Sequence, residues 1–151
     1  ETDSECPGHP IWIEPDEWLG SNLTENFPYH LVSPQPNDKL HSQLECAIAD
    51  IPNERPTPIM INQEDAKELN VKSGNIIRIY NMRGSCLARA QISDEIKKGV
   101  MSLPTGAWFD TDEEGVEQQG NPNALTFDKG TSRLGQGPSA HTTLVNIVKE
   151  K

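Results

Sequence analysis

Short runs of β-branched and aromatic residues, separated by polar and proline-rich segments, make up most of the chain after residue 28. Such runs predict strands, because side chains of alternating polarity suit a sheet with one buried face. The predicted strands cover residues 29–33, 59–61, 75–80, 85–92, 100–103 and 142–148. We therefore expect a mainly β domain assembled from short strands.

Turn and cap residues predict the connections between these strands. Asn81-Met82-Arg83-Gly84 separates two strand-like runs, and Gly84 can supply the positive φ that a tight hairpin needs. Asn62 has the position of a helix N-cap, with Asp65 three residues on, which predicts a helix over residues 63–69 that closes near Gly74. Single helical turns are expected over residues 93–99 and within residues 40–49.

The chain divides into an arm and one domain. Residues 1–28 contain four prolines together with Trp12 and Trp18, a composition typical of an irregular arm whose aromatic side chains pack against something larger. Residues 29–151 are long enough for a domain with its own core. Residues 106–140 form a long polar, glycine-rich stretch, and a loop of that length in a compact domain is usually functional or disordered.

Charge and hydropathy exclude several classes of partner. The formal net charge is −10, so a clustered basic surface for duplex nucleic acid or anionic membrane is not expected. No window approaches the ~18 consecutive apolar residues of a membrane span, and the N-terminal residues do not resemble a signal peptide. The sequence opens at Glu1 without a methionine, and we expect it to be a piece of a longer polypeptide.

Common catalytic and metal-binding motifs do not match. Cys6, Cys46 and Cys86 are widely spaced, which predicts neither a disulfide framework nor a zinc site. The segment from Gly130 has Walker-like glycine spacing but lacks the Lys-Ser/Thr pair, and there is no G-x-S-x-G elbow. The acidic stretch that starts at Asp110 lacks the spacing of a calcium loop and is best interpreted as a solvated loop.

Two segments carry a more specific signal. They are Ser33-Pro-Gln-Pro-Asn-Asp-Lys-Leu-His-Ser-Gln-Leu44 and Gly120-Asn-Pro-Asn-Ala-Leu-Thr126, the latter continuing to His141-Thr-Thr-Leu-Val145. Together they resemble the C-terminal molybdopterin-dinucleotide-binding domain of the dimethyl sulfoxide reductase family. Residues 81–88 and 106–110 match its intervening blocks, and residues 9–15 resemble the approach to that domain in biotin sulfoxide and trimethylamine N-oxide reductases.

The resemblance implies a double-psi β-barrel of about six strands with short helices and long polar loops. It also implies a fragment of an oxidoreductase that removes oxygen from S-oxides or N-oxides, such as biotin, methionine or dimethyl sulfoxide or trimethylamine N-oxide. The cofactor would be bis(molybdopterin guanine dinucleotide) molybdenum, bound jointly with upstream domains of the same polypeptide. The resemblance places the metal ligand and the substrate pocket upstream, so we expect no catalytic or metal-ligating residue here and no activity in the isolated chain.

The residues expected to contact the cofactor follow from the matching positions. Against the pterins and the diphosphate, the resemblance places Ser33, Gln35, His41, Ser42 and Gln43, with Lys39 as the candidate cation. It assigns Asn121 or Asn123, together with Gln136, to the other cofactor edges. Amide and hydroxyl groups suit this task because they satisfy ring donors and acceptors without burying net charge. Some relatives have histidine at the position of Gln35, so the contact there can differ.

Partners and compartment are expectations of the same kind. A small S-oxide or N-oxide substrate and an electron-donor cytochrome would serve the full enzyme. A periplasmic location is favoured, with the cytoplasm as the alternative. The competing hypothesis is a stand-alone β-barrel interaction module that keeps the scaffold and binds no cofactor.

Overall fold

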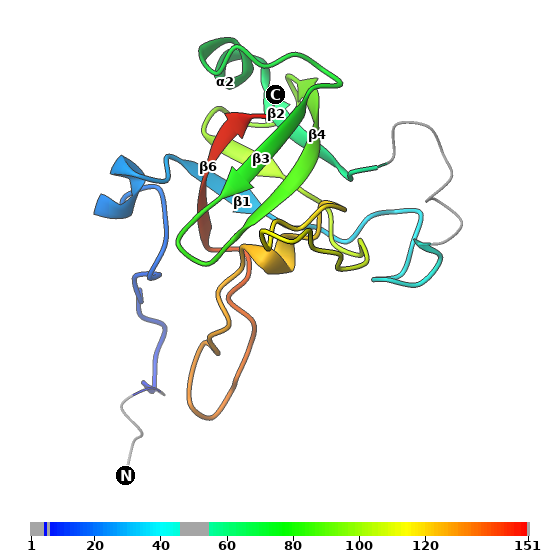
Figure 1. The fold of residues 1–151 in the computed structure, drawn as a ribbon. Helices are drawn as coiled ribbons and strands as arrows, with labels where there is room; N and C mark the ends of the chain where they lie inside the picture. The colour runs from blue at the N-terminus through cyan, green and yellow to red at the C-terminus, as the bar shows by residue number, and fades with distance from the viewer. Residues whose placement is uncertain (1–4, 6, 46–54, 151) are drawn as a thin grey trace.

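Six strands close into a barrel in the computed structural model, which describes residues 5, 7–45 and 55–150. Around the barrel the strands follow the order β1-β5-β2-β4-β3-β6, and β6 pairs with β1 to close the sheet (Figure 1). The strands are β1 (Tyr29–Val32), β2 (Pro58–Asn62), β3 (Ile76–Tyr80), β4 (Ser85–Ser93), β5 (Val100–Ser102) and β6 (Thr143–Lys149). All six predicted strands are therefore confirmed, with ends shifted by one or two residues.

Two of the neighbouring pairs run parallel. β1 is parallel to β5 and β2 is parallel to β4, whereas the other four pairs are antiparallel. Parallel neighbours cannot be joined by a tight turn, so long connections cross between them. This closed arrangement is the double-psi β-barrel that the resemblance implies.

The core fills the inside of the barrel with alternate residues of each strand. Strands β2 and β3 each bury their second and fourth residues, so Ile59 and Ile61 face Ile77 and Ile79 across the interior. On β4, the buried positions include the small residues Ala88 and Ala90. A strand with period-two burial has one face in the core and one face outside.

Helix α2 (Gln63–Glu68) begins as predicted and ends earlier than predicted. The side chain of Asn62 accepts the backbone N–H of Glu64 at 2.8 Å, which is an N-cap hydrogen bond. The helix stops before Asn70, which takes a positive φ of 53°. Asp65 is buried and accepts the backbone N–H of Gly99 at 2.7 Å, so it ties α2 to the turn before β5.

The role expected for Gly84 in the hairpin between β3 and β4 is wrong. Gly84 does not have a positive φ. A Cβ atom built on it would lie 2.8 Å from the carbonyl oxygen of Ala124, in the 3₁₀ helix η2 (Pro122–Ala124). Glycine is needed there because η2 packs directly against the turn.

In its described part the N-terminal arm contains a 3₁₀ turn, η1 (Asn22–Glu25), and a buried carboxylate ties the arm to the barrel. The carboxylate of Glu17 accepts hydrogen bonds from both terminal nitrogens of Arg83, at 2.5 and 3.1 Å, and from the backbone N–H of Leu144, at 2.7 Å. Nearer the N-terminus the arm runs beside the projecting loop of residues 126–142 (Figure 1), and Asp16 pairs with Lys129 at 2.7 Å.

Other expectations have different outcomes. The helical turn predicted within residues 40–49 is described only as far as residue 45, and residues 40–44 form turns and an isolated bridge instead of a helix, whereas Cys6 and Cys46 lie outside the described residues. Residues 94–99, where a single helical turn is also expected, form bends and a turn without a helix. Cys86 is buried on β4 and unpaired. Within the described part of the chain, no helix is both long and apolar enough to cross a membrane.

Candidate functional site

Three chain segments meet at one end of the barrel. Because β1 and β5 run parallel, the loops that follow them, residues 33–45 and 103–109, leave the barrel at the same end. β6 is antiparallel to β1 and therefore begins there. The first two loops are joined by a hydrogen bond from the backbone N–H of Thr105 to the carbonyl of Pro34, at 3.0 Å.

A hollow of about 510 Å³ lies between these loops and the segment around η2. Its walls are His41, Ser42, Thr105, Gly106, Ala107, Trp108, Phe109, Asn121 and Asn123. Four of the predicted site residues thus come together, although about 80 residues separate the two pairs in the sequence. The polar groups on its walls are hydroxyl, imidazole and amide groups, which both donate and accept hydrogen bonds.

Gly106 sets the distance between two walls of this hollow. Its φ is +106°, and a Cβ atom built on it would lie 2.2 Å from the carbonyl oxygen of His41. His41 also has a positive φ, of 50°. The loop after β5 can lie against the loop after β1 only because residue 106 has no side chain.

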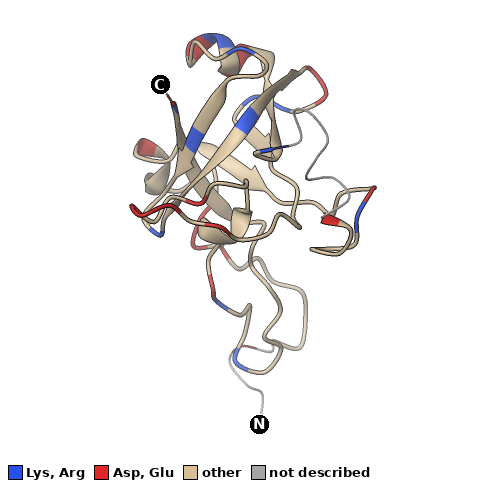
Figure 2. Ribbon diagram, turned by 45° about the vertical axis from the view of Figure 1, so that its right-hand side comes forward, with Lys and Arg blue, Asp and Glu red and all other residues tan. Residues whose placement is uncertain are grey.

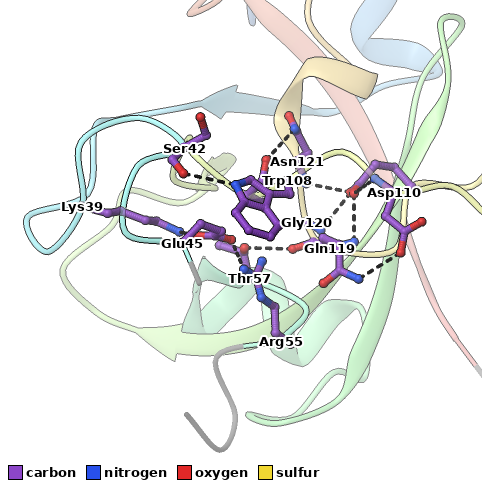
Figure 3. Close-up of polar contacts among 12 residues, drawn as sticks. Lys39, Ser42, Glu45, Arg55, Thr57, Trp108, Asp110, Gln119, Gly120 and Asn121 are labelled. Carbon is purple, nitrogen blue, oxygen red and sulfur yellow. Dashed lines mark hydrogen bonds and ion pairs between the residues drawn. The ribbon is translucent and has the colours of Figure 1, made fainter. Parts of the chain in front are cut away.

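Aromatic side chains form the outer rim. Trp108 and Phe109 are 55% and 62% exposed, although both carry large apolar surfaces. The indole N–H of Trp108 donates to the carbonyl oxygen of Ser42 at 3.1 Å, which fixes the ring across the entrance between the two loops (Figure 3). Exposed aromatic rings beside polar groups are typical of a surface that binds a ring system or another domain.

The two asparagines have different environments. Asn121 is buried, donates from its side chain to the carbonyl of Ala107 at 2.7 Å (Figure 3), and accepts the backbone N–H of Asn123 at 2.9 Å. Asn123 is exposed on the wall of the hollow. The sequence left the choice between them open, and the geometry gives Asn121 an internal task and leaves the amide of Asn123 available to a ligand.

A buried carboxylate that the sequence did not single out organises this wall. Glu117 is fully buried, and its two oxygens accept the backbone N–H groups of Gln119, Gly120 and Asn121 at 2.7 to 2.9 Å. It also accepts the N–H of Asp110 at 3.4 Å. Beside it, burial raises the pKa of the Cys86 thiol, and the charge of Glu117 raises that pKa further.

The remaining predicted residues of the loop after β1 lie beside the hollow rather than on its wall. The side-chain amide of Gln35 donates to the carbonyl of Lys39 at 2.6 Å. Gln43 is exposed, and its backbone N–H donates to the carbonyl of Leu40 at 2.9 Å. Ser33 is 5% exposed, and its Oγ has no hydrogen-bond partner.

Lys39 is already paired. Its ammonium group lies 2.6 Å from Glu45, a fully buried carboxylate that also pairs with Arg55 (Figure 3). Lys39 lines a second hollow, of about 230 Å³, with residues of β2, β4 and β5. Its predicted role as a cation for the diphosphate stays a prediction.

Gln136 belongs to the loop of residues 126–142, which projects from the barrel (Figure 1), and it is not among the residues that line the hollow. Its side-chain amide donates to the carbonyls of Ser132 and Arg133 within that loop, at 2.8 and 3.1 Å. The structure therefore does not bring it together with His41, Ser42 and Asn123. Its contact with the cofactor also stays a prediction.

Charges are spread over the molecule. Lys and Arg residues of the described chain lie on several strands and loops among Asp and Glu residues (Figure 2). Within the described residues, no group of three or more His, Cys, Asp and Glu side chains is placed to hold a metal ion. The side chains that line the hollow offer hydroxyl, imidazole and amide groups for polar recognition.

Comparison with known proteins identifies relatives of this chain. Residues 29–144 match the family described as "Molydopterin dinucleotide binding domain", that is, the molybdopterin dinucleotide-binding domain. Biotin sulfoxide reductase of Cereibacter sphaeroides is 48% identical over 147 residues, which are 95% of this chain and 20% of that protein. Trimethylamine-N-oxide reductase of Haemophilus influenzae is 42% identical over 158 residues, covering 97% of this chain and 18% of that protein.

A solved structure supports the fold. Acetylene hydratase from Pelobacter acetylenicus superimposes with a TM-score of 0.75 at 17% identity, covering 93% of this chain and 21% of that one. The chain thus spans about a fifth of the length of the curated relatives it matches. Neither comparison supports the alternative of a stand-alone interaction module.

Proposed function

Because this chain belongs to the molybdopterin dinucleotide-binding domain family, we propose that it forms one wall of the cofactor site in a molybdenum-dependent reductase of S-oxides or N-oxides. The cofactor of this proposal is bis(molybdopterin guanine dinucleotide) molybdenum. The rest of the site belongs to other domains of the same polypeptide, since this chain spans about a fifth of its relatives.

The observation that carries the proposal is the convergence of Ser42, Asn123 and His41 on one hollow from loops far apart in the sequence. Pterin and guanine rings present amide-like donors and acceptors on their edges, and hydroxyl, amide and imidazole groups complement both kinds. The unpartnered buried Oγ of Ser33 beside the same loops is a further group that a bound polar ligand would satisfy. The residues present therefore fit this cofactor.

When bound, the molybdenum held by two pterin dithiolenes supplies the oxygen-atom transfer itself. The residues of this chain bind and orient the organic part of the cofactor. Asn123 and Ser42 offer hydrogen bonds from two different segments of the wall. Trp108 and Phe109 present exposed apolar surface beside these polar groups, which suits packing against a ring system of the cofactor.

The partner in this proposal is the remainder of the same polypeptide. Ile11, Trp12 and Ile13 are consecutive and are 51%, 75% and 66% exposed on the arm. Three large apolar side chains in succession are costly to leave in water, and the missing four fifths of the relatives' length offers a surface to cover them.

Compartment and electron donor follow from the relatives only as proposals. We infer a periplasmic enzyme reduced by a cytochrome, with a cytoplasmic enzyme as the alternative. Cell fractionation of the organism that carries the gene, with blotting for this chain, distinguishes the two compartments.

The proposal is tested on the full-length protein that contains this chain. It is purified from a host that makes the cofactor, and its molybdenum and GMP contents are measured, together with reduction of sulfoxides and N-oxides by reduced methyl viologen. We expect about two GMP per molybdenum and turnover of at least one substrate. Protein without molybdenum or GMP from a competent host would contradict the proposal.

A further inference from the structure

The two ends of the projecting loop of residues 126–142 are joined by one side chain. The amide of Asn81, in the turn between β3 and β4, donates to the carbonyl oxygen of Leu125 at 2.8 Å and to that of Leu144 at 3.2 Å. Leu125 precedes the loop and Leu144 follows it. These two residues therefore form the neck of the loop, where it leaves the barrel (Figure 1).

Arg83, in the same turn, braces the first end of the neck. Its Nε donates to the carbonyl oxygen of Leu125 at 2.8 Å, and the central carbon of its guanidinium group lies 5.2 Å from the centre of the Phe127 ring. A cation over the face of an aromatic ring is attracted to it. One side chain thus holds residues on both sides of the point where the loop begins.

The second end of the neck is held from the N-terminal arm. The carboxylate of Glu17 accepts the backbone N–H of Leu144 at 2.7 Å, and the same carboxylate pairs with Arg83. The side chain of Glu17 is buried, and hydrogen bonds to a buried charged acceptor are strong. The arm therefore supplies the group that links Arg83, at the first end, to Leu144, at the second.

The neck is continuous with one wall of the hollow. Leu125 directly follows η2, and its backbone N–H donates to the carbonyl of Pro122, the first residue of η2, at 2.9 Å. Asn123, which lines the hollow, lies two residues before Leu125. A shift of the carbonyl group of Leu125 would therefore move the part of the wall that carries Asn123.

Resting on the proposed function, we propose that Glu17 and Arg83 are positioning residues of the cofactor site. Neither of them lines the hollow. Their ion pair closes the neck of the projecting loop from the side of the arm, and the closed neck keeps Asn123 in its place on the wall. The arm is then a structural part of the site, and its carboxylate acts on the site through Arg83 and Leu125.

Trypsin cleavage after Arg133, an exposed residue of the projecting loop, measures whether the neck is closed. The experiment uses the 151-residue chain, whose six strands close around a core of their own, and mass spectrometry identifies the fragments. Cleavage follows the population of the open loop, so Glu17→Gln should be cut at least about tenfold faster than the parent. Asp16→Asn, which breaks an exposed ion pair between the arm and Lys129 of the loop, should be cut at close to the parental rate.

A core variant separates an open neck from a general loss of stability. Val71 is buried and follows α2, and α2 lies at the end of the barrel away from the projecting loop (Figure 1). Val71→Ala lowers the free energy of unfolding by leaving a cavity, without changing the neck. Its cleavage after Arg133 should stay within about twofold of the parental rate. Equal acceleration in Val71→Ala and Glu17→Gln would overturn the role of the ion pair at the neck.

The effect on the site is measured as GMP per polypeptide in the full-length protein. Glu17→Gln should lower this content about fivefold, and Val71→Ala should keep the parental content. Combining Glu17→Gln with Arg83→Met leaves no guanidinium without its carboxylate, so the melting temperature should recover toward the parental value. The neck still lacks its tie, so the GMP content should stay low. GMP content that recovers together with stability, or parental content in Glu17→Gln, overturns the proposal.

The two measurements separate failure of this inference from failure of the proposed function. If the parental full-length protein contains no GMP, the proposed function fails, and the cleavage rates still test the closure of the neck. If the parent contains GMP and Glu17→Gln retains all of it, the proposed function stands and the positioning role fails.

Discussion

The Oε2 atom of Glu117 lies 2.7 Å from the backbone nitrogen of Asn121, and this contact shapes one wall of the hollow. The same carboxylate accepts the N–H groups of Gln119 and Gly120, so one buried charge is satisfied by consecutive backbone donors. Hydrogen bonds to a charged acceptor are stronger than those between neutral groups. These hydrogen bonds hold the turn in one conformation. Asn123, two residues after Asn121, therefore has a fixed position on the wall of the hollow.

Glu117→Gln should lower the free energy of unfolding by about 3 kcal/mol, because one of the two acceptor oxygens becomes an NH₂ group that faces backbone donors. Urea unfolding of the 151-residue chain, followed by circular dichroism, measures this. The matched control is Glu113→Gln, an exposed residue of the same loop, which should change stability by less than about 0.5 kcal/mol. Equal effects would show that Glu117 has no special structural role.

Asn121→Ala should mainly lower the stability of the fold, whereas Asn123→Ala should mainly lower the GMP content of the full-length protein. The side chain of Asn121 makes one buried and one partly buried hydrogen bond, so its loss should lower the free energy of unfolding by about 2 kcal/mol. The side chain of Asn123 is exposed, so its loss should leave stability nearly unchanged and lower the GMP content of the full-length protein severalfold. Full GMP content in Asn123→Ala would remove this residue from the candidate site.

Gly106→Ala should displace the loop that carries His41. Gly115→Ala is the control, because Gly115 also has a positive φ but has no atom within 4 Å of the new Cβ. Backbone strain alone predicts a loss of about 1 kcal/mol at residue 115. The added clash at residue 106 predicts about 3 kcal/mol and a marked loss of bound GMP in the full-length protein. Similar values for the two variants would refute the close approach as the cause.

Glu17→Gln should release the N-terminal arm. The substitution leaves the guanidinium of Arg83 without its carboxylate partner, at an expected loss of about 3 kcal/mol. Chymotrypsin should then cut at Trp12 and Trp18 faster than in the parent. Asp16→Asn breaks an exposed ion pair in the same arm and should leave the cleavage rate close to parental. Unchanged cleavage in Glu17→Gln would mean that other contacts hold the arm.

Stability should fall at alkaline pH through Cys86. Burial raises the pKa of its thiol in the folded chain, so above pH 9 the unfolded chain loses the proton while the folded chain keeps it. The folded state then binds more protons, and the free energy of unfolding falls as pH rises, by up to about 1.4 kcal/mol per pH unit. Urea unfolding between pH 8 and 10 should show this slope in the parent and a smaller one in Cys86→Ala. Parallel pH profiles would contradict the buried-thiol assignment.

Local patterns were sufficient for the strands and for the start of α2. The period-two burial of β2 and β3 and the side-chain cap of Asn62 depend on residues close together in the sequence. The structural role of Glu117 could not be predicted from a local pattern. Its neighbours Glu113 and Glu114 have the same side chain, and only burial in the fold distinguishes Glu117 from them. The task of Gly84 was misassigned for the same reason, since its close contact is with Ala124, forty residues away.

By itself the sequence determined where strands form, which polar blocks flank them and which family those blocks resemble, because strand propensity, capping and motif spacing act over a few residues. Three relationships depend on the folded barrel: β1 lies between β5 and β6, the loops that carry His41 and Asn123 share one hollow, and the ring of His141 lies beside the backbone of Ser33. Those relationships arise when the barrel closes. Closure brings together groups about 80 to 110 residues apart, whose pairing depends on the packing of the whole core rather than on any local pattern.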